Sequence, residues 1–279
     1  TTIWGTSSSW TLTALPLFVW MGEILFRTKL SENLFKGLSP WMQKLPGGLI
    51  HVNVVGCALF AAISGSSAAT VATVGKMSIP ELRKRNYPEK ILLGSLAGSG
   101  TLGLLIPPSI ILIIYGVAVQ ESIAKLFIAG IIPGIMIALI FMSYVIIWSL
   151  INKKTMPKII EEYSFFEKIK RSKQLLPVII LILAVIGSIY TGIATATEAA
   201  SLGVVGALIL SYFQKSLTLK TFKSSLLGAT KTSCMIAFIL AGSTFLSLAM
   251  GFTGLPRNLA LWIQNMELSP YVLIFVLMI

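Results

Sequence analysis

Glycine and hydroxyl residues gather at two places within apolar stretches of the chain. The first is SGSS at residues 64–67, with Thr70 nearby, and the second is SGTLG at residues 99–103, followed by Pro107 and Pro108. A helix that ends inside a membrane presents carbonyls suited to Na⁺, and one that begins there presents N–H groups suited to a carboxylate. Because the two breaks lie within about forty residues of each other, they indicate one site.

Few residues are present for other kinds of chemistry. All ten acidic residues are glutamates, and His51 is the single histidine. No catalytic residue and no metal other than Na⁺ is therefore expected. His51 with Ser64 or Ser66 would allow an intramembrane serine protease only if another group oriented the imidazole, and the sequence offers none. No P-loop motif is present.

The composition is that of an integral membrane protein. Hydrophobic residues make up 55% of the 279 residues and charged residues 11%, with a mean hydropathy of +0.87. Apolar runs near the ~20 residues needed to cross a bilayer predict an all-α polytopic fold, with residues 1–279 as one transmembrane transport domain. The net charge of +12 fits an anionic lipid leaflet, and no nucleic-acid partner is expected.

Basic residues indicate how the chain is threaded through the bilayer. Twenty of the 22 lysines and arginines lie in four segments, which are residues 27–44, 76–90, 153–173 and 215–231. Positively charged loops stay on the cytoplasmic side, so all four should share one face.

The stretch from residue 48 to residue 75 does not fit a topology in which every apolar segment crosses the membrane once. It joins two basic segments, so a single crossing would put Lys36 and Arg83 on opposite faces of the membrane. We predict a re-entrant hairpin instead, with its tip at SGSS. Gly65 permits a backbone conformation closed to other residues, and Ser66 or Ser67 can cap the returning helix. The alternative is one long helix in which these small residues allow close packing.

Residues 91–119 predict a second discontinuous helix. Each internal glycine costs about 1 kcal/mol of helix stability and an internal proline about 3 kcal/mol. Pro107 and Pro108 would also leave the carbonyls of Gly103 and Leu104 without their helical donors.

Two glutamates are further candidates. Glu23 lies four residues before Arg27, which favours a local ion pair over a proton relay. Glu198 follows a turn rich in Gly and Thr, where it caps the next helix or has a functional role.

Five motifs give the chain a resemblance to a known family. They are GGLIHVNVVGCALFAAISGSSAATVATVG, IPELRKRNYPEKI, AGSGTLGLLIPPSIILIIYG, SIAKLFIAGIIPG and TGIATATEAA, and they follow one another along nearly the whole chain. In this order they resemble the large membrane subunit of the tripartite ATP-independent periplasmic (TRAP) transporters.

The resemblance implies a secondary transporter, not an enzyme, in the bacterial inner membrane. It would import an organic acid such as sialic acid or a C4-dicarboxylate, with Na⁺ as the coupling ion and no organic cofactor. Its partners would be a periplasmic substrate-binding protein and a small membrane subunit, either separate or fused. The fold implied is of the elevator type, in which the broken segments move past a scaffold that includes the helix near residues 10–26.

The resemblance also assigns residues to the site. The Na⁺ ligands would come from Ser64, Gly65, Ser66, Ser99, Gly100, Thr101 and Gly103, with the stretch 99–103 unwound. The substrate residues would be Ser66, Ser67, Thr70, Pro107 and Pro108. A second hairpin and a second Pro-Pro helix, which the family pattern requires, have no counterpart before Ile279. We therefore expect a chain truncated at both ends that carries half of the site. An ion channel with a re-entrant loop stays open as an alternative.

Overall fold

The computed structural model of the protein describes residues 10–28, 30–157 and 163–278. Every regular element in these ranges is a helix, which confirms the all-α prediction. In chain order the elements are η1 (Trp10–Thr13), α2 (Ala14–Phe26), α3 (Leu30–Met42), η2 (Gly48–Ile50), α4 (His51–Ser64), α5 (Ser67–Lys84), α6 (Glu89–Gly100), η3 (Thr101–Leu104), α7 (Ile110–Val119), α8 (Ile123–Ile151), η4 (Lys153–Thr155), α9 (Phe165–Ser172), α10 (Leu176–Tyr190), α11 (Ala196–Phe213), α12 (Leu219–Phe252), α13 (Leu255–Gln264) and α14 (Pro270–Met278).

The chain divides into two compact units. The larger consists of residues 9–233, and the smaller includes residues 234–278. Helix α12 begins in the larger unit and ends in the smaller one, which also contains α13 and α14. All the residues predicted for the site belong to the larger unit.

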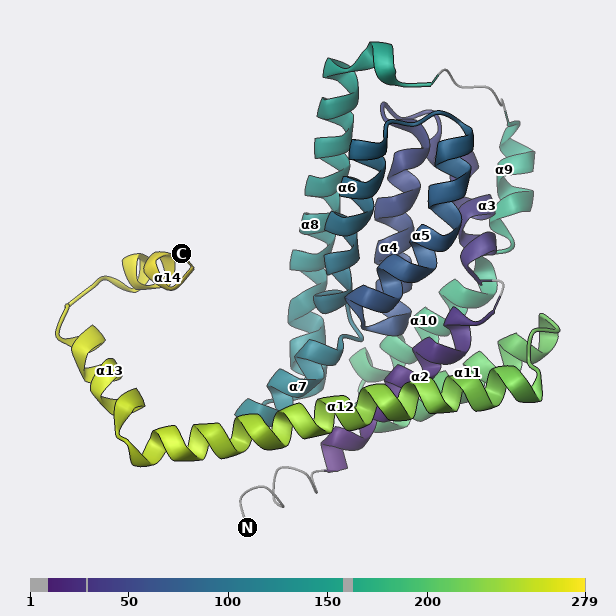
Figure 1. Cartoon of the computed structure of the whole chain (residues 1–279). Coiled ribbons are helices and arrows are strands. Elements are labelled where there is room, and N and C mark those ends of the chain that lie inside the picture. The colour runs from purple at the N-terminus through teal and green to yellow at the C-terminus, as the bar shows by residue number, and fades with distance from the viewer. Residues whose placement is uncertain (1–9, 29, 158–162, 279) are drawn as a thin grey trace. The chain divides into compact units, whose positions relative to one another are not determined.

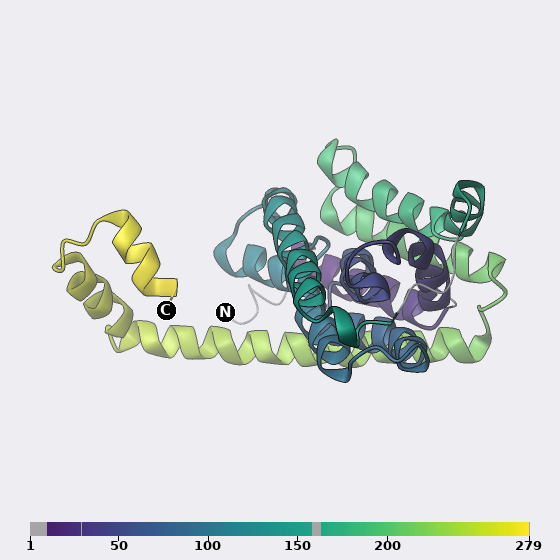
Figure 2. The same ribbon diagram turned by 90° about the horizontal axis from the view of Figure 1, so that it is seen from above.

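Helices α4, α5, α6 and α8 lie side by side in the larger unit (Figure 1). Figure 2 shows the same group from above, with α4 and α5 close to end-on. The core of this group is apolar and includes Phe60, Leu82, Leu92 and Phe127, each fully buried. Burial of these side chains holds together helices whose connecting segments contain glycine or proline.

Helices α4 and α5 run in opposite directions, so the start of α4 and the end of α5 lie next to each other. The backbone N–H of Leu49, before α4, donates to the Tyr87 hydroxyl, after α5, across 3.0 Å. A Cβ added to Gly48 would lie 2.5 Å from the same oxygen. Burial raises the pKa of Tyr87, so its hydroxyl stays neutral in this contact. The chain therefore enters and leaves this pair at the same end.

The end of α8 lies at this place too. A Cβ added to Gly47 would be 2.6 Å from Cγ1 of Val145, and Ile50, Ile91 and Val145 pack together in one buried cluster. The segments after α5 and after α8, both rich in lysine and arginine, thus adjoin the start of α4. This is the arrangement that the charge pattern requires, while the position of the bilayer stays a prediction.

A second group of helices in the larger unit is built around α2 and α11, which pack against each other along their length. Their contact is close because Gly203 of α11 has no side chain, and a Cβ there would be 2.5 Å from the Met21 sulfur. Figure 1 shows α2, α11 and the first part of α12 running crosswise to α4, α5 and α8. Helix α2 also touches α4, which links the two groups.

Several helices have the length and hydropathy of membrane spans. Helices α8, α11 and α12 each meet both criteria, and α9 with α10 would add a span bent by 57°. The protein is a multi-pass membrane protein.

Candidate functional site

The first break lies between α4 and α5, at Gly65 and Ser66. Helix α4 ends at Ser64, and Gly65 follows with a φ of +58°, in the left-handed region that favours glycine. Ser66 is extended, and its hydroxyl accepts the Ala69 N–H across 3.4 Å as the N-cap of α5. Local chemistry alone accounts for this turn.

Buried hydroxyls hold the turn in shape. The hydroxyls of Ser64 and Thr70 lie 3.0 Å apart, and Thr70 donates to the Ser66 carbonyl across 2.8 Å. Ser64 is nearly buried and Thr70 fully so. In this state Thr70 binds protein groups at the turn, which gives it a positioning role.

The second break lies later in the chain than the sequence predicts. The predicted unwound stretch, residues 99–103, is helical: α6 continues to Gly100, and η3 covers Thr101–Leu104. The irregular residues are 105–109, ahead of α7. The reason is that Pro107 and Pro108, which follow η3, have no backbone N–H to donate. The helical hydrogen bonds are therefore interrupted only after η3.

The carbonyl freed at Leu104 has a replacement partner. Ser109, fully buried, donates its hydroxyl to that oxygen across 2.5 Å and accepts the Leu112 N–H across 3.5 Å as the N-cap of α7. The peptide bond between Pro107 and Pro108 is cis. Ser99 and Thr101 donate within their own helix, Ser99 to the Ser95 carbonyl and Thr101 to the Gly98 carbonyl.

The two breaks are in direct contact. The Ile110 N–H donates to the Gly65 carbonyl across 3.3 Å. A Cβ added to Gly65 would lie 2.6 Å from the Pro108 carbonyl oxygen, and one added to Gly103 would lie 2.9 Å from the Ser67 nitrogen. Backbone meets backbone here, because glycine leaves no side chain between the two segments.

The predicted residues fall into two groups. Residues 64–67, Gly103 and Pro108 are brought to the contact between the breaks, whereas the Pro107 ring lies toward α8, 3.5 Å from a Cβ added to Gly130. Gly100 lies one turn away, where a Cβ would meet Val71. Thr101 is exposed, and its hydroxyl is engaged by its own helix.

One hydroxyl at this contact has no partner. The Oγ atom of Ser67 is buried and makes no hydrogen bond within the described part of the chain. Ser67 is the first residue of α5, and its backbone nitrogen faces Gly103. A buried polar atom left unpaired at a helix start is available to a ligand.

The helix α2 approaches the same turn from outside. A Cβ added to Gly22 would lie 2.9 Å from Cα of Ser64. A glycine of the predicted scaffold helix thus faces the last residue of α4.

The two glutamates lie away from this contact. Glu23 pairs with Arg27, and the Arg27 Nε donates to the Ser224 hydroxyl across 3.1 Å. Glu198 forms a capping box at the start of α11, accepting the Thr195 N–H across 2.8 Å.

Sequence reasoning missed two polar residues in the helices next to the breaks. Asn53, fully buried in α4, donates to the Leu92 carbonyl across 3.2 Å and to the Ser95 hydroxyl across 3.0 Å, which joins α4 to α6. Ser109 caps α7, as described above. Asn53 stands alone in the apolar run HVNVVG, and Ser109 follows two prolines, so both could have been found by asking which polar residue an apolar helix tolerates.

His51 lies far from the serines at the turn. It is the first residue of α4 and Ser64 is the last, so the two are about 20 Å apart along the helix. The His51 Nε2 lies 2.8 Å from the Pro46 carbonyl oxygen. This geometry excludes the serine–histidine dyad.

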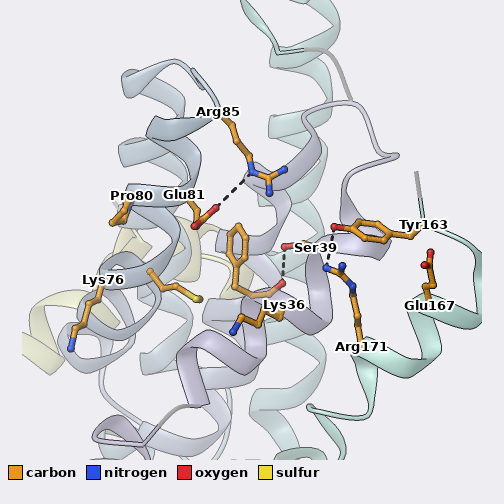
Figure 3. Close-up of a pocket in the computed structure, with 11 residues that line it drawn as sticks. Lys36, Ser39, Lys76, Pro80, Glu81, Arg85, Tyr163, Glu167 and Arg171 are labelled. Carbon is orange, nitrogen blue, oxygen red and sulfur yellow. Dashed lines mark hydrogen bonds and ion pairs between the residues drawn. The ribbon is translucent and has the colours of Figure 1, made fainter. Parts of the chain in front are cut away.

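A hollow of about 720 Å³ elsewhere in the larger unit is lined by charged side chains of both signs (Figure 3). Arg85 pairs with Glu81 at 3.8 Å, and Arg171 donates to the Tyr163 hydroxyl across 3.0 Å. Glu167 accepts the Ser164 N–H across 3.0 Å. None of the predicted site residues lines this hollow.

Comparison with known proteins identifies the family. The family model described as the tripartite ATP-independent periplasmic transporter, DctM component, matches residues 1–279. The C4-dicarboxylate TRAP transporter large permease protein DctM of Pseudomonas aeruginosa is 33% identical, over 97% of this chain and 63% of its own length. The sialic acid TRAP transporter large permease protein SiaM of Vibrio cholerae is 32% identical, over 98% of this chain and 64% of its own.

A third relative is the isethionate TRAP transporter permease protein DctMQ of Oleidesulfovibrio alaskensis. It is 32% identical, over 90% of this chain and 40% of its own length. The chain thus spans less than two thirds of each of these relatives. All three are named as transporter permeases, not as enzymes. The chain belongs to the DctM component family of the tripartite ATP-independent periplasmic transporters.

Proposed function

We propose that this chain is part of the large membrane subunit of a Na⁺-coupled importer of an organic acid in the bacterial inner membrane. The observation that carries the proposal is the contact between the two breaks, where Gly65 and Gly103 let the turn after α4 meet the segment before α7. Irregular backbone in a membrane protein is tolerated where it is buried in protein or lines a cavity, and such breaks form the sites of secondary transporters.

The two breaks offer different chemistry. The end of α4 and the end of η3 supply carbonyls for Na⁺, and the predicted ligand residues Ser64, Gly65, Ser66 and Gly103 lie at these ends. A carbonyl oxygen has two lone pairs, so Gly65 can accept from Ile110 and still bind a cation. Ser99, Gly100 and Thr101 precede this point and position η3.

The start of α5 is the proposed place for the substrate carboxylate. Ser67 supplies an unpaired hydroxyl there, at a helix start where the N–H groups of the first residues have no acceptor within the helix and Ser66 caps that of Ala69. Ser66 and Thr70 fix the turn, Pro108 lies against Gly65, and Pro107 fixes the backbone next to it. No side chain needs to act as a catalyst.

The names of the three relatives described above support the class of substrate. They refer to C4-dicarboxylates, sialic acid and isethionate, all of which are organic anions at neutral pH. We propose that this protein also carries an organic anion, supplied by a periplasmic binding protein. The relative named DctMQ supports a small membrane partner, either separate or fused.

Coupling follows if Na⁺ stabilises one arrangement of the two breaks. With Na⁺ bound, the turn after α4 and the end of η3 would keep the geometry that binds the carboxylate; without it, affinity falls. The proposed motion is an elevator in which α4 to α7 move past α2. Helices α2 and α4 are in contact through Gly22 and Ser64, which supports this choice of moving and fixed parts.

Uptake by proteoliposomes tests this function. The full-length protein, with its membrane partner and binding protein, is supplied with labelled succinate or sialic acid, with and without an inward Na⁺ gradient and in the absence of ATP. We expect Na⁺-dependent accumulation of one acid. Ser67→Ala should reduce it at least about tenfold, which corresponds to the ~1.4 kcal/mol of one hydrogen bond to a charged group.

The control is Ser201→Ala on α11, where the hydroxyl binds only its own helix. It should leave uptake within about twofold. Equal uptake with and without the gradient would contradict Na⁺ coupling. Passive Na⁺ flux that needs neither the acid nor the binding protein would instead establish the channel alternative.

A further inference from the structure

A basic pocket lies where α12 begins, beside the end of α2. Its volume is about 740 Å³, and its cations are Arg27, Lys220, Lys223 and Lys231. The rest of its lining is Ser224, Gly228 and two leucines. Among the described residues, the lining of this pocket includes no carboxylate, whereas Glu81 and Glu167 line the hollow of Figure 3.

Helical spacing places the three lysines on one face of α12. Residues three or four apart lie on the same side of a helix. Lys220, Lys223 and Lys231 therefore lie on one side of α12, with Ser224 and Gly228 between them. Within the described residues, none of the three lysines has an ion-pair or hydrogen-bond partner. Their charges therefore face the pocket without compensation.

Arg27 is fixed at the edge of this face. Its Nε donates to Ser224 across 3.1 Å, and its Nη1 pairs with Glu23. The pair fits against α12 because residue 228 is glycine, where a Cβ would be 2.5 Å from the Glu23 carboxylate. Since Glu23 neutralises Arg27, the pocket keeps the charge of the three lysines and gains one rigid guanidinium wall.

The pocket lies at the boundary between apolar helix and polar loop. Helix α2 ends at Phe26, α11 ends at Phe213, and α12 is long and apolar enough to span a membrane from this point onward. Tyr212 and Phe213 are 70% and 76% exposed, as aromatic residues at a membrane interface commonly are. The charge pattern assigns this end to the cytoplasmic side.

Apolar surface adjoins the cations. Leu219 is 72% exposed and Leu227 60% exposed, and both line the pocket. A free phosphate or a soluble anion would use the lysines only. A phospholipid would use both surfaces, with its phosphate among the lysines and its acyl chains along the leucines.

We propose that this pocket binds the headgroup of an anionic phospholipid from the cytoplasmic leaflet, with phosphatidylglycerol as the representative. Bound there, the lipid bridges the start of α12 and the end of α2. This inference concerns a site separate from the helix breaks, and it does not depend on which acid is transported.

The test uses the purified full-length protein in detergent, with bound lipid counted by native mass spectrometry as phosphatidylglycerol or phosphatidylcholine is added. We expect phosphatidylglycerol to bind at least about tenfold more tightly, since each lysine near the surface adds about fivefold. The triple variant Lys220→Gln, Lys223→Gln, Lys231→Gln should lose this preference.

The matched control removes the same charge elsewhere on the predicted cytoplasmic side. The variant Lys153→Gln, Lys154→Gln, Lys170→Gln alters three exposed lysines outside the pocket and should keep the preference. If the pocket variant is poorly folded, single Lys223→Gln and Lys223→Arg proteins replace it, and only the arginine should retain tight binding. Equal loss in the pocket variant and the control would overturn the proposal, as would full competition by inorganic phosphate at equal concentration.

Discussion

At the scale of single residues, the site depends on glycines that bring two backbones together. Gly65 has a positive φ and faces the Pro108 carbonyl, and Gly103 faces the peptide between Ser66 and Ser67. A side chain at either position would separate the breaks. The hydroxyls of Ser64 and Thr70 fix the turn, whereas the buried Ser67 hydroxyl has no hydrogen-bond partner among the described residues.

Replacing Gly65 with alanine should therefore reduce uptake. A left-handed conformation costs a non-glycine residue about 1 kcal/mol or more, and the new Cβ would lie 2.6 Å from the Pro108 oxygen. We expect uptake to fall at least about tenfold, with a lower melting temperature, as measured in proteoliposomes and by thermal unfolding.

The control is Gly94→Ala in α6, where a Cβ would meet nothing within 4 Å. Alanine is the better helix former, so this variant should be as stable as the parent or slightly more stable. If both alanine variants transport normally, the contact between the breaks is not needed for transport.

At the scale of elements, the arrangement of helix ends decides the topology. The start of α4, the end of α5 and the end of α8 meet around Tyr87 and Val145, while Gly65 lies at the opposite end of α4. The turn after α7, which contains Glu121, lies at the far end of α8 from Val145. If α4 and α5 enter and leave the membrane on the same side, the basic segments before and after them share a face, as the charge pattern predicts.

Cysteine labelling measures this arrangement. In a cysteine-free background, Lys36→Cys and Lys84→Cys place single thiols on exposed positions before and after the hairpin. Both should react with a membrane-impermeant maleimide from the cytoplasmic side. Glu121→Cys, also exposed, should react from the periplasmic side only. Labelling of positions 36 and 84 from opposite sides would establish a single crossing.

At the scale of the whole molecule, both breaks and the layer of α2 and α11 belong to one compact unit, residues 9–233. Ligand binding at the breaks should thus stabilise the fold of that unit. The chain covers less than two thirds of its named relatives, so the transport cycle must be measured on the full-length protein.

Na⁺ should raise the melting temperature of the full-length protein. A ligand present at a hundred times its dissociation constant adds about 2.7 kcal/mol to the free energy of unfolding. We expect a shift of several degrees on replacing choline chloride with NaCl at equal ionic strength, observed by thermal unfolding. Gly65→Ala should show no such difference. An equal melting temperature in both salts for the parent protein would contradict Na⁺ binding.

The sequence by itself determined the class of fold, the family and the kinds of residue at the breaks. Gly65, the Ser66 cap and the Thr195–Glu198 capping box act on backbone groups within a few residues, so their chemistry can be read without tertiary contacts. The net excess of lysine and arginine in four segments likewise carries topological information.

Only the tertiary structure decided where the second break falls and what it touches. The helix persists through Leu104, although Gly98, Gly100 and Gly103 predict an earlier end, because packing against α5 outweighs glycine's low propensity. The approach of Gly103 to Ser67 and the bonds of Asn53 to α6 join residues about forty positions apart. Such contacts depend on how whole helices pack, and local sequence does not specify that.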